Sequence, residues 1–246
     1  FAANDGSNGV ELWVSNGTES GTALVKDIAS GGVSSSPDGL AAAGGVLLFS
    51  AQDGINGREL WKSAGTTAGT VLLKNIDPTG PEDLPSNLVD LDGTLLFSAQ
   101  DRGKSSELWR SDGTALGTVL LHEFRGRSPI SNMVLAGQVA YFVADDGTHG
   151  RELWRSDGTA AGTAMVKDLY TGSPGAAPAE LTLVGSTLYF TATDSSGGWE
   201  LWKSDGTEAN TIRVKDIRSG FYGSSPRSLV QVDNVLYFVA DDGEHG

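Results

Sequence analysis

The chain contains no cysteine among its 246 residues, which excludes disulfide bonds and metal sites built from thiolates. Basic residues are scarce as well, since 17 lysines and arginines face 31 aspartates and glutamates, a formal net charge of −14. A surface of this sign repels phosphate backbones and anionic lipid, which argues against nucleic-acid partners and membrane-surface binding. The same surface attracts cations, calcium among them.

Long apolar runs and compact catalytic motifs are also missing. No stretch approaches the roughly 18 apolar residues of a membrane-spanning helix, so we expect no membrane insertion. The three histidines, His122, His149 and His245, do not have the His-x-x-x-His spacing of zinc ligands. A Gly-x-Ser-x-Gly elbow and a phosphate-binding glycine loop are both absent from the sequence. These absences predict a protein that is not an enzyme.

An internal repeat dominates what is present. The tripeptide Glu-Leu-Trp occurs five times, at intervals of 48, 48, 45 and 48 residues. A phenylalanine stands twelve residues before each of its tryptophans, and an aspartate follows that phenylalanine by four residues. The tryptophans are Trp13, Trp61, Trp109, Trp154 and Trp202, and the phenylalanines are Phe1, Phe49, Phe97, Phe142 and Phe190, with Phe238 as a sixth copy.

Each unit of about 48 residues predicts four short strands, here called A to D. Strand B is an apolar run such as 236–240, strand C is Glu-Leu-Trp-x-Ser, and strand D is a run such as 22–28. Four strands per unit match one blade of a β-propeller. Blades stack face to face, which explains why strand B is almost continuously apolar. We therefore predict an all-β fold, a β-propeller of four-stranded blades in which residues 1–246 form a single domain.

The unit keeps its length except at one place. The spacing from phenylalanine to tryptophan is constant, and the three residues missing from the third unit fall after Glu123, between strands D and A. A surface connection tolerates such a change, whereas a packed blade does not. The phenylalanine and tryptophan rings are accordingly predicted to fill the space between blades.

The strand C motif resembles that of a known family. Residues 107–114, 152–159 and 200–207 each read Glu-Leu-Trp-x-x-Asp-Gly-Thr in full, while Asn16 and Ala64 replace the aspartate in the first two units. Over essentially its whole length, the chain resembles the bacterial ELWxxDGT-repeat family of large secreted or surface proteins. The resemblance implies an extracellular or cell-surface location and says little about mechanism.

The two ends carry equivalent segments, because residues 1–9 correspond to residues 238–246. Two arrangements follow from this equivalence. The last A and B strands complete the blade begun by the first C and D strands, which closes a five-bladed ring, or the chain is part of a longer array. We favour five blades and expect a longer parent polypeptide.

Acidic residues recur at the end of strand B and open the loop to strand C. Carboxylates and loop carbonyls together suit a hard cation, so calcium is a candidate ligand. The alternative is that each aspartate accepts hydrogen bonds from its own loop, and recurrence in every copy favours this alternative. No loop has the ligand spacing of an EF-hand. The candidate metal ligands are Asp53, Asp146, Asp194 and Asp242, in a series that also includes Asp5 and Asp101.

The glutamate of each Glu-Leu-Trp lies on the same face of strand C as the tryptophan. Such a residue could be read as an acid for glycoside hydrolysis, but one active site does not need five equivalent acids. We expect buried glutamates that are hydrogen-bonded to neighbouring backbone. These residues are Glu11, Glu59, Glu107, Glu152 and Glu200.

Four aromatic residues break the repeat and form the candidate ligand site. Trp199 stands in a B-to-C loop, Tyr170 in the preceding D-to-A connection, and Phe221 and Tyr222 in the following one. Exposed aromatic rings among glycine, serine and acidic groups suit sugar stacking or protein docking, although they could equally cover gaps between loops. We expect a non-catalytic extracellular module for adhesion, matrix or complex assembly that recognises protein or glycan. A calcium-assisted lectin is the alternative, and a propeller-based lyase or glycosidase ranks third.

Overall fold

The computed structural model describes residues 1–76, 85–101, 105–196 and 198–245, with the side chains of residues 100, 101 and 105 outside that description. Over the described residues the chain forms 21 β-strands and no helix, which confirms the predicted all-β class. It divides into two compact units, Phe1–His122 and Glu123–Gly246. A single domain over residues 1–246 stays a prediction.

The first unit begins with a three-stranded sheet and continues with two four-stranded sheets. Neighbouring strands of each sheet are also neighbours along the chain. The small sheet contains β1 (Ala2–Asn4), β2 (Val10–Val14) and β3 (Ala23–Lys26). The next contains β4 (Asp38–Ala43), β5 (Val46–Gln52), β6 (Arg58–Ser63) and β7 (Val71–Lys74). The third contains β8 (Ser86–Leu91), β9 (Thr94–Asp101), β10 (Ser105–Ser111) and β11 (Val119–Phe124), which crosses the boundary between the units.

The second unit contains two four-stranded sheets and a hairpin. One sheet is formed by β12 (Ser131–Ala136), β13 (Val139–Asp145), β14 (Arg151–Ser156) and β15 (Ala164–Lys167). The other is formed by β16 (Ala179–Val184), β17 (Thr187–Thr193), β18 (Trp199–Ser204) and β19 (Ile212–Lys215), and the hairpin by β20 (Arg227–Val232) and β21 (Val235–Val239). The four-stranded units predicted from the repeat are therefore present, whereas the ring stays a prediction.

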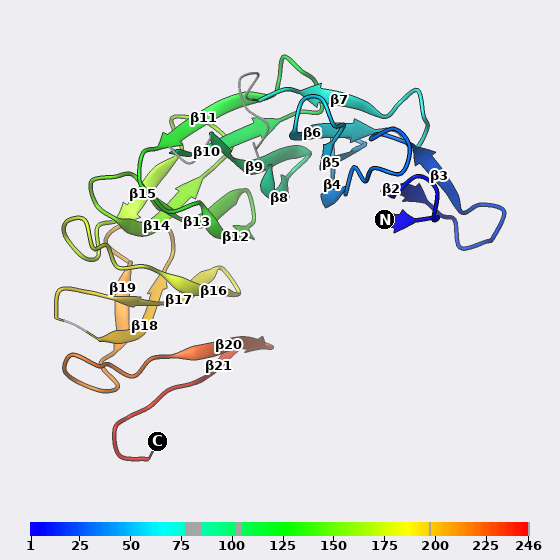
Figure 1. Cartoon of the computed structure of the whole chain (residues 1–246). Helices are drawn as coiled ribbons and strands as arrows, with labels where there is room; N and C mark the ends of the chain where they lie inside the picture. Colours follow the sequence, from blue (N-terminus) through cyan, green and yellow to red (C-terminus); the bar gives the residue numbers. More distant parts are fainter. Residues whose placement is uncertain (77–84, 102–104, 197, 246) are drawn as a thin grey trace. The chain divides into compact units, whose positions relative to one another are not determined.

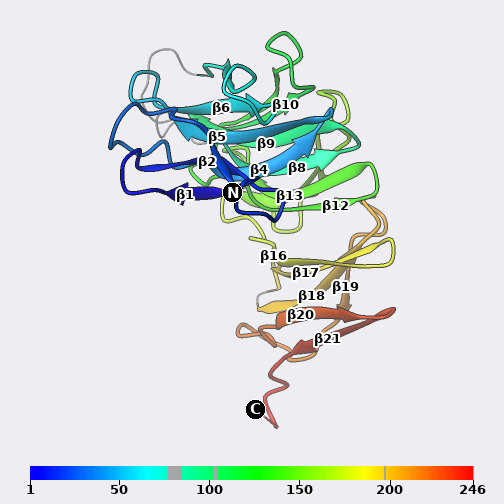
Figure 2. The same cartoon turned by 90° about the vertical axis from the view of Figure 1, so that its right-hand side faces the viewer.

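Within each unit, the A strands of sheets that follow one another in the chain contact each other. Strand β4 contacts β8 in the first unit, and in the second unit β12 contacts β16 and β16 contacts β20. Figures 1 and 2 show these strands side by side within each unit from two directions. The D strands lie at the opposite edge of each sheet.

The recurring aromatic rings form the core between adjacent sheets. Phe49 lies opposite Trp61 in the β5–β6 ladder, and Phe190 lies opposite Trp202 in the β17–β18 ladder. Both phenylalanines are completely buried. Phe49 packs against Leu12 of the preceding sheet, so a ring in one sheet fills the space beside the next.

A lysine at the end of strand D also ties two of the sheets to the sheets that follow them. Lys26 Nζ donates a hydrogen bond to the carbonyl oxygen of Thr70 at 2.8 Å, and Lys167 Nζ donates to that of Thr211 at 2.9 Å. Lysine and threonine are 44 residues apart in both cases. The Lys26 ammonium also lies 5.9 Å from the centre of the Trp61 ring. The contact is therefore a repeated feature of the interface between sheets.

The motif residues after strand C build the turn to strand D. Asp157 Oδ1 accepts hydrogen bonds from the Thr159 amide and from its hydroxyl, at 2.9 and 2.7 Å. The hydroxyl groups of Ser156 and Thr163 lie 2.8 Å apart and close the turn. Asn16 replaces the aspartate in the first unit and accepts the same bonds from Thr18. The motif therefore encodes a turn.

Candidate binding site on the loop face

Buried glutamates anchor the connections between strands D and A. Glu11 accepts hydrogen bonds from the Ile28 amide at 3.0 Å and from the Ser35 amide at 2.9 Å. The Ser35 hydroxyl donates to the same carboxylate at 2.5 Å. Glu200 has the same arrangement with Ser224, whose amide and hydroxyl lie 3.0 and 2.6 Å from its oxygens. These carboxylates are occupied in holding the loop.

Glu152 lacks the serine hydroxyl that donates a hydrogen bond to Glu11 and to Glu200. Its carboxylate accepts hydrogen bonds from the amides of Leu169, Tyr170 and Ala176, at 3.3, 3.2 and 2.8 Å. Ala176 stands where the first and fifth units have Ser35 and Ser224, so no hydroxyl donor is supplied at this position. Burial raises the pKa of Glu152 to about 7, against the opposing effect of the three amides, and nearby Asp168 adds to the rise.

The glutamates of the second and third units complete the series. Glu59 is fully buried and accepts a hydrogen bond from the Ile76 amide at 2.9 Å. Glu107 is only half-buried, and its carboxylate accepts a hydrogen bond from Trp109 Nε1 at 2.9 Å. Each of the five glutamates is thus bonded to the protein itself, an arrangement typical of structural carboxylates.

The aspartates at the end of strand B are bound by their own loops. Asp53 accepts hydrogen bonds from the amides of Ile55 and Asn56 and from Asn56 Nδ2, at 2.8, 2.7 and 2.6 Å. Asp146 does the same with Thr148 and His149, whose Nδ1 lies 2.7 Å from the carboxylate. This pattern is an Asx-type turn.

Asp242 and Asp194 complete the candidate metal ligands. The imidazole and amide of His245 hold the pKa of Asp242 at about 2. Asp194 accepts hydrogen bonds from the amide and hydroxyl of Ser196, and Arg213 lies 3.8 Å from its carboxylate. No group of three or more metal-ligating side chains occurs in the described part of the chain, and the side chain of Asp101 lies outside it. Calcium binding stays a prediction.

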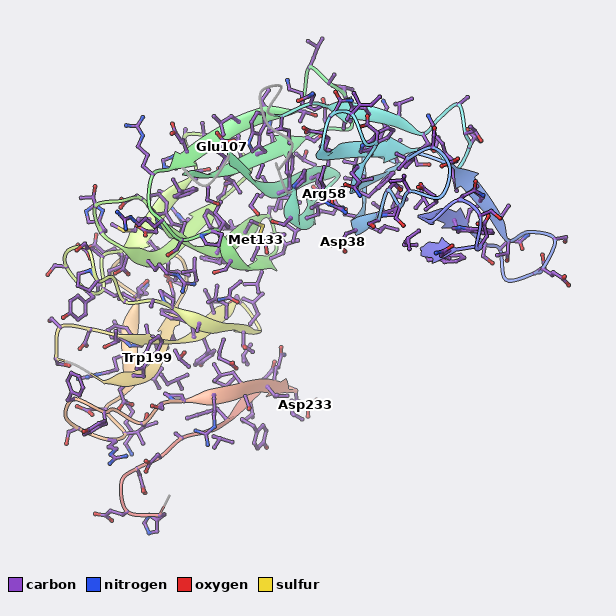
Figure 3. The ribbon with its side chains drawn as sticks, in the orientation of Figure 1. Asp38, Arg58, Glu107, Met133, Trp199 and Asp233 are labelled. Atoms are coloured by element: carbon purple, nitrogen blue, oxygen red, sulfur yellow. The ribbon has the colours of Figure 1, made fainter. Side chains whose placement is uncertain are left out.

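Three of the four predicted aromatic residues come together in one pair of loops. Trp199 forms an isolated parallel bridge with Gly223, and its carbonyl oxygen accepts a hydrogen bond from the Ser224 amide at 2.9 Å. Phe221 and Tyr222 precede this bridge directly, with ring centres 5.7 Å apart and planes at 84°. We call Trp199, Phe221 and Tyr222 the aromatic patch; Figure 3 labels Trp199 at the start of β18.

The patch is exposed, and a glycine makes its geometry possible. The exposed fractions are 82% for Phe221, 75% for Tyr222 and 36% for Trp199. Gly223 has a φ of 59°, and a Cβ atom there would lie 2.3 Å from the Trp199 nitrogen. Only glycine allows the two loops to approach so closely.

Tyr170 does not belong to the aromatic patch. It lies between β15 and β16, is half-buried and packs against the core cluster that contains Leu153 and Phe190. Its amide donates to Glu152 at 3.2 Å. The structure therefore agrees with the alternative interpretation of Tyr170, in which the ring covers a gap between loops. Gly197, in the loop before Trp199, lies outside the described residues.

Charged residues beside the patch were not predicted from the sequence. Arg213 lies 3.5 Å from Asp216 as well as 3.8 Å from Asp194, and Arg218 forms an ion pair with Asp241. Arg213 stands where the other units have leucine or methionine, as at Leu72. Aligning the units and searching for residues unique to one of them would have revealed this arginine.

The residue before each Glu-Leu-Trp varies among the units. Arg58 Nη1 donates hydrogen bonds to the Ser36 carbonyl oxygen and to the Ser50 hydroxyl, at 2.8 and 3.1 Å. Arg151 occupies the equivalent position in a later unit and donates to the Ser131 hydroxyl at 3.0 Å. Trp199 takes this position in the fifth unit, so an aromatic ring replaces a guanidinium group there.

Comparisons with known proteins identify the fold type. No family model and no curated protein matches the sequence. Among solved structures, one from an analysis of two prolyl endopeptidases has a TM-score of 0.57 at 13% identity, covering 98% of this chain and 36% of that chain. A variant of puromycin hydrolase complexed with PGG has a TM-score of 0.50 at 18% identity, covering 82% and 33%. A puromycin-hydrolyzing peptidase of Mycobacterium tuberculosis has a TM-score of 0.51 at 14% identity, covering 89% and 35%.

The shared feature of these neighbours is a β-propeller domain. The chain spans about a third of the length of the solved structures to which it is similar. Identities this low relate the fold alone, which is all-β and built from four-stranded antiparallel sheets of the propeller type. A separate finding concerns membranes, since no helix with the length and hydropathy of a membrane span occurs in the described residues.

Proposed function

We propose that this chain is a non-catalytic binding or scaffold module that recognises a glycan or protein at the aromatic patch. The exposure of Phe221 and Tyr222 carries the proposal. Large aromatic rings that are exposed to water side by side are typical of a binding surface. The other units have no such pair at this position, so the fold itself does not require it.

The use of the recurring carboxylates supports a non-catalytic role. Glu11 and Glu200 are buried and saturated with hydrogen bonds from loop amides and serine hydroxyls. A general acid must exchange a proton with a substrate within hydrogen-bond distance. The carboxylates of Glu11 and Glu200 are instead hydrogen-bonded to loops of the protein itself. The acidic surface and the family resemblance favour work outside a bacterial cell, in adhesion, matrix or complex assembly.

A binding experiment with patch variants tests the proposal. The purified chain is applied to a glycan array and to an array of bacterial surface proteins, each with calcium and with a chelator. Phe221→Ala/Tyr222→Ala should reduce binding at least tenfold and leave the melting temperature nearly unchanged. Ile55→Ala removes an equally exposed apolar side chain from a B-to-C loop and serves as the control. Unchanged binding by the double variant would overturn the proposal, and loss of binding with the chelator alone would favour the calcium-assisted lectin.

We further propose that the sheets close into a five-bladed ring. The sheet β1–β3 has strands B, C and D, whereas the hairpin β20–β21 has strands A and B. Together they contain every strand of a fifth blade, with strand B in duplicate. Four complete sheets of the same pattern support this arrangement.

A further inference from the structure

The turn between β2 and β3 contains an asparagine followed by a glycine, Asn16 and Gly17. At the same repeat positions, residues 112–113, 157–158 and 205–206 read Asp-Gly. A glycine has no side chain to hinder its backbone nitrogen, so this nitrogen attacks a preceding asparagine carboxamide more readily than that of any other residue. Asparagine is accordingly among the thermolabile residues of proteins. The first unit therefore has a candidate site of covalent modification at a motif position.

The carboxamide of Asn16 is held as the motif aspartates are held. Its Oδ1 accepts hydrogen bonds from the Thr18 amide at 3.0 Å and from the Thr18 hydroxyl at 2.7 Å. Asp112 accepts the same two bonds from Thr114, at 2.8 and 2.7 Å. Asn16 and Asp112 are both exposed. Water therefore reaches Asn16, and the turn would accept an aspartate there without rearrangement.

The two Thr18 donors lie on the oxygen that becomes negative during attack on the carboxamide. When a nucleophile adds to Cγ of Asn16, the electron pair of the carbonyl group moves onto Oδ1. Hydrogen-bond donors that are already in place on such an oxygen stabilise the tetrahedral intermediate. Thr18 thus gives Asn16 a small counterpart of an oxyanion hole.

The attacking nitrogen also has a hydrogen-bond acceptor. The Gly17 amide donates to the Ser15 hydroxyl at 3.0 Å, and this hydroxyl lies 2.7 Å from that of Thr22. The Gly17 nitrogen must lose its proton when it becomes a nucleophile. Ser15 is exposed, so the proton can pass by way of its hydroxyl to water.

The chain has two other Asn-Gly pairs, and both are bound differently. Asn56 Nδ2 donates a hydrogen bond to Asp53 at 2.6 Å, and Asn8 Nδ2 donates to Asp5 at 2.7 Å. This nitrogen would have to leave as ammonia and therefore needs an added proton. A carboxylate bound to it accepts a hydrogen bond and supplies no proton. These two pairs should accordingly react more slowly than Asn16.

We propose that Asn16 is a site of spontaneous deamidation, whose product is the aspartate of the motif. In the first step the Gly17 nitrogen forms a bond to Cγ of Asn16, the bond from Cγ to Nδ2 breaks, and ammonia leaves a succinimide ring. Water then adds to Cγ, the bond between Cγ and the Gly17 nitrogen breaks, and that nitrogen takes up a proton. One water molecule is consumed and one ammonia molecule is released.

The Thr18 donors also select the product. Opening the succinimide at Cγ gives aspartate, whereas opening at the backbone carbonyl carbon gives isoaspartate. The donors lie on the oxygen attached to Cγ and favour attack of water at that carbon. The first unit then has the motif aspartate and one more negative charge.

The aspartate is an end point of the reaction. The hydroxyl and the amide of Thr159 lower the pKa of Asp157, and Thr114 acts in the same way on Asp112. A carboxylate that stays ionised is a poor target for a backbone nitrogen. The aspartates of the complete motifs are therefore expected to persist, and an aspartate at position 16 is expected to persist with them.

Peptide mass spectrometry of the aged protein tests the proposal. The purified chain is kept in mildly alkaline buffer, and the three Asn-Gly pairs are compared in the same digests, with a fresh sample as the zero point. Asn16 should convert severalfold faster than Asn56 and Asn8. The variant Asn16→Asp supplies the standard that separates the aspartyl from the isoaspartyl peptide. Conversion of Asn16 no faster than that of Asn56 would overturn the proposal, and so would isoaspartate as the main product.

Substitutions of Thr18 test the part played by its hydroxyl. Thr18→Val removes this donor and should slow the conversion severalfold, whereas Thr18→Ser keeps it and should retain the wild-type rate. Thr66→Val is the matched control, because it removes the equivalent hydroxyl from the turn of the second unit. It should leave the rate at Asn16 unchanged. Circular dichroism establishes that each variant is folded, and an unchanged or faster conversion in folded Thr18→Val would overturn the role assigned to Thr18.

Discussion

The Ser35 hydroxyl lies 2.5 Å from the buried Glu11 carboxylate and donates a hydrogen bond to it. The position equivalent to Ser35 in the fourth unit is Ala176, whose methyl group offers no donor to Glu152. A buried carboxylate with one donor fewer holds its charge less readily. Burial raises the pKa of Glu152, and the missing donor leaves less to oppose that rise, so the loop around Glu152 should respond to pH.

The free energy of unfolding should fall as the pH rises through about 7. The folded pKa of Glu152 is raised to about 7 from its usual 4.5, so the native state binds the proton more tightly than the unfolded chain. The stabilisation is complete below pH 4.5 and is lost above pH 7, by about 3 kcal/mol at most. Urea unfolding between pH 4 and 9 measures it. Glu152→Gln should flatten this dependence, and a wild-type slope retained in that variant would contradict the assignment.

Ala176→Ser should restore the missing donor and lower the pKa of Glu152. A hydrogen bond to a charged group contributes about 1.5–3 kcal/mol, so the variant should be more stable at pH 8 and little changed at pH 5. Ser224→Ala creates the opposite change beside Glu200 and should destabilise the protein at pH 8. Equal effects of Ala176→Ser at both pH values would show that packing, and not charge, is responsible.

The turn after strand C allows a stabilising substitution. At the aspartate position of the motif, Ala64 is the one residue among the five units that has no side-chain oxygen. Asp112, at the same position in the third unit, accepts a hydrogen bond from the Thr114 amide at 2.8 Å. Ala64→Asp should therefore raise the free energy of unfolding by about 0.5–1.5 kcal/mol, the usual contribution of one hydrogen bond. Asp112→Ala should lower it by a similar amount. Chemical denaturation compares the two, and a destabilised Ala64→Asp variant would refute the prediction.

Two tryptophans should respond differently to truncation. Trp154 is buried and contacts Phe124 edge-on at 4.9 Å between ring centres, so Trp154→Ala should cost about 3–5 kcal/mol. Trp199 is partly exposed, and Trp199→Ala should shift the melting temperature only slightly while weakening ligand binding. Calorimetry of both variants separates the roles. Unfolding of the Trp199→Ala variant would place this ring in the core and remove it from the patch.

The imidazole of His149 should titrate above its usual value of 6.5. The hydrogen bond to the Asp146 carboxylate at 2.7 Å raises its pKa, against the opposing effect of burial. Two-dimensional NMR of the ring protons measures this pKa. Asp146→Asn should bring it down, whereas Asp53→Asn, in an equivalent loop without histidine, should leave it unchanged.

The repeat in the sequence determined the secondary structure. Strand B pairs with strand C twelve residues later, as Phe49 does with Trp61, and the turn residues lie between them. Interactions at such short separations are encoded locally, by apolar patterning and turn chemistry, and they recur because the sequence recurs. The all-β class and the four-stranded sheets therefore follow from the printed residues alone.

Tertiary structure decided the partners of the polar groups. Glu11 is satisfied by a loop up to 24 residues away, and Lys26 by a carbonyl oxygen 44 residues away in the next sheet. Tyr170 and Phe221 are both aromatic residues in connections between strands D and A. Tyr170 nevertheless packs against a core cluster, whereas Phe221 is exposed to solvent. Such outcomes depend on which loop covers which surface, and pattern alone does not specify that, because burial is a property of the packed chain.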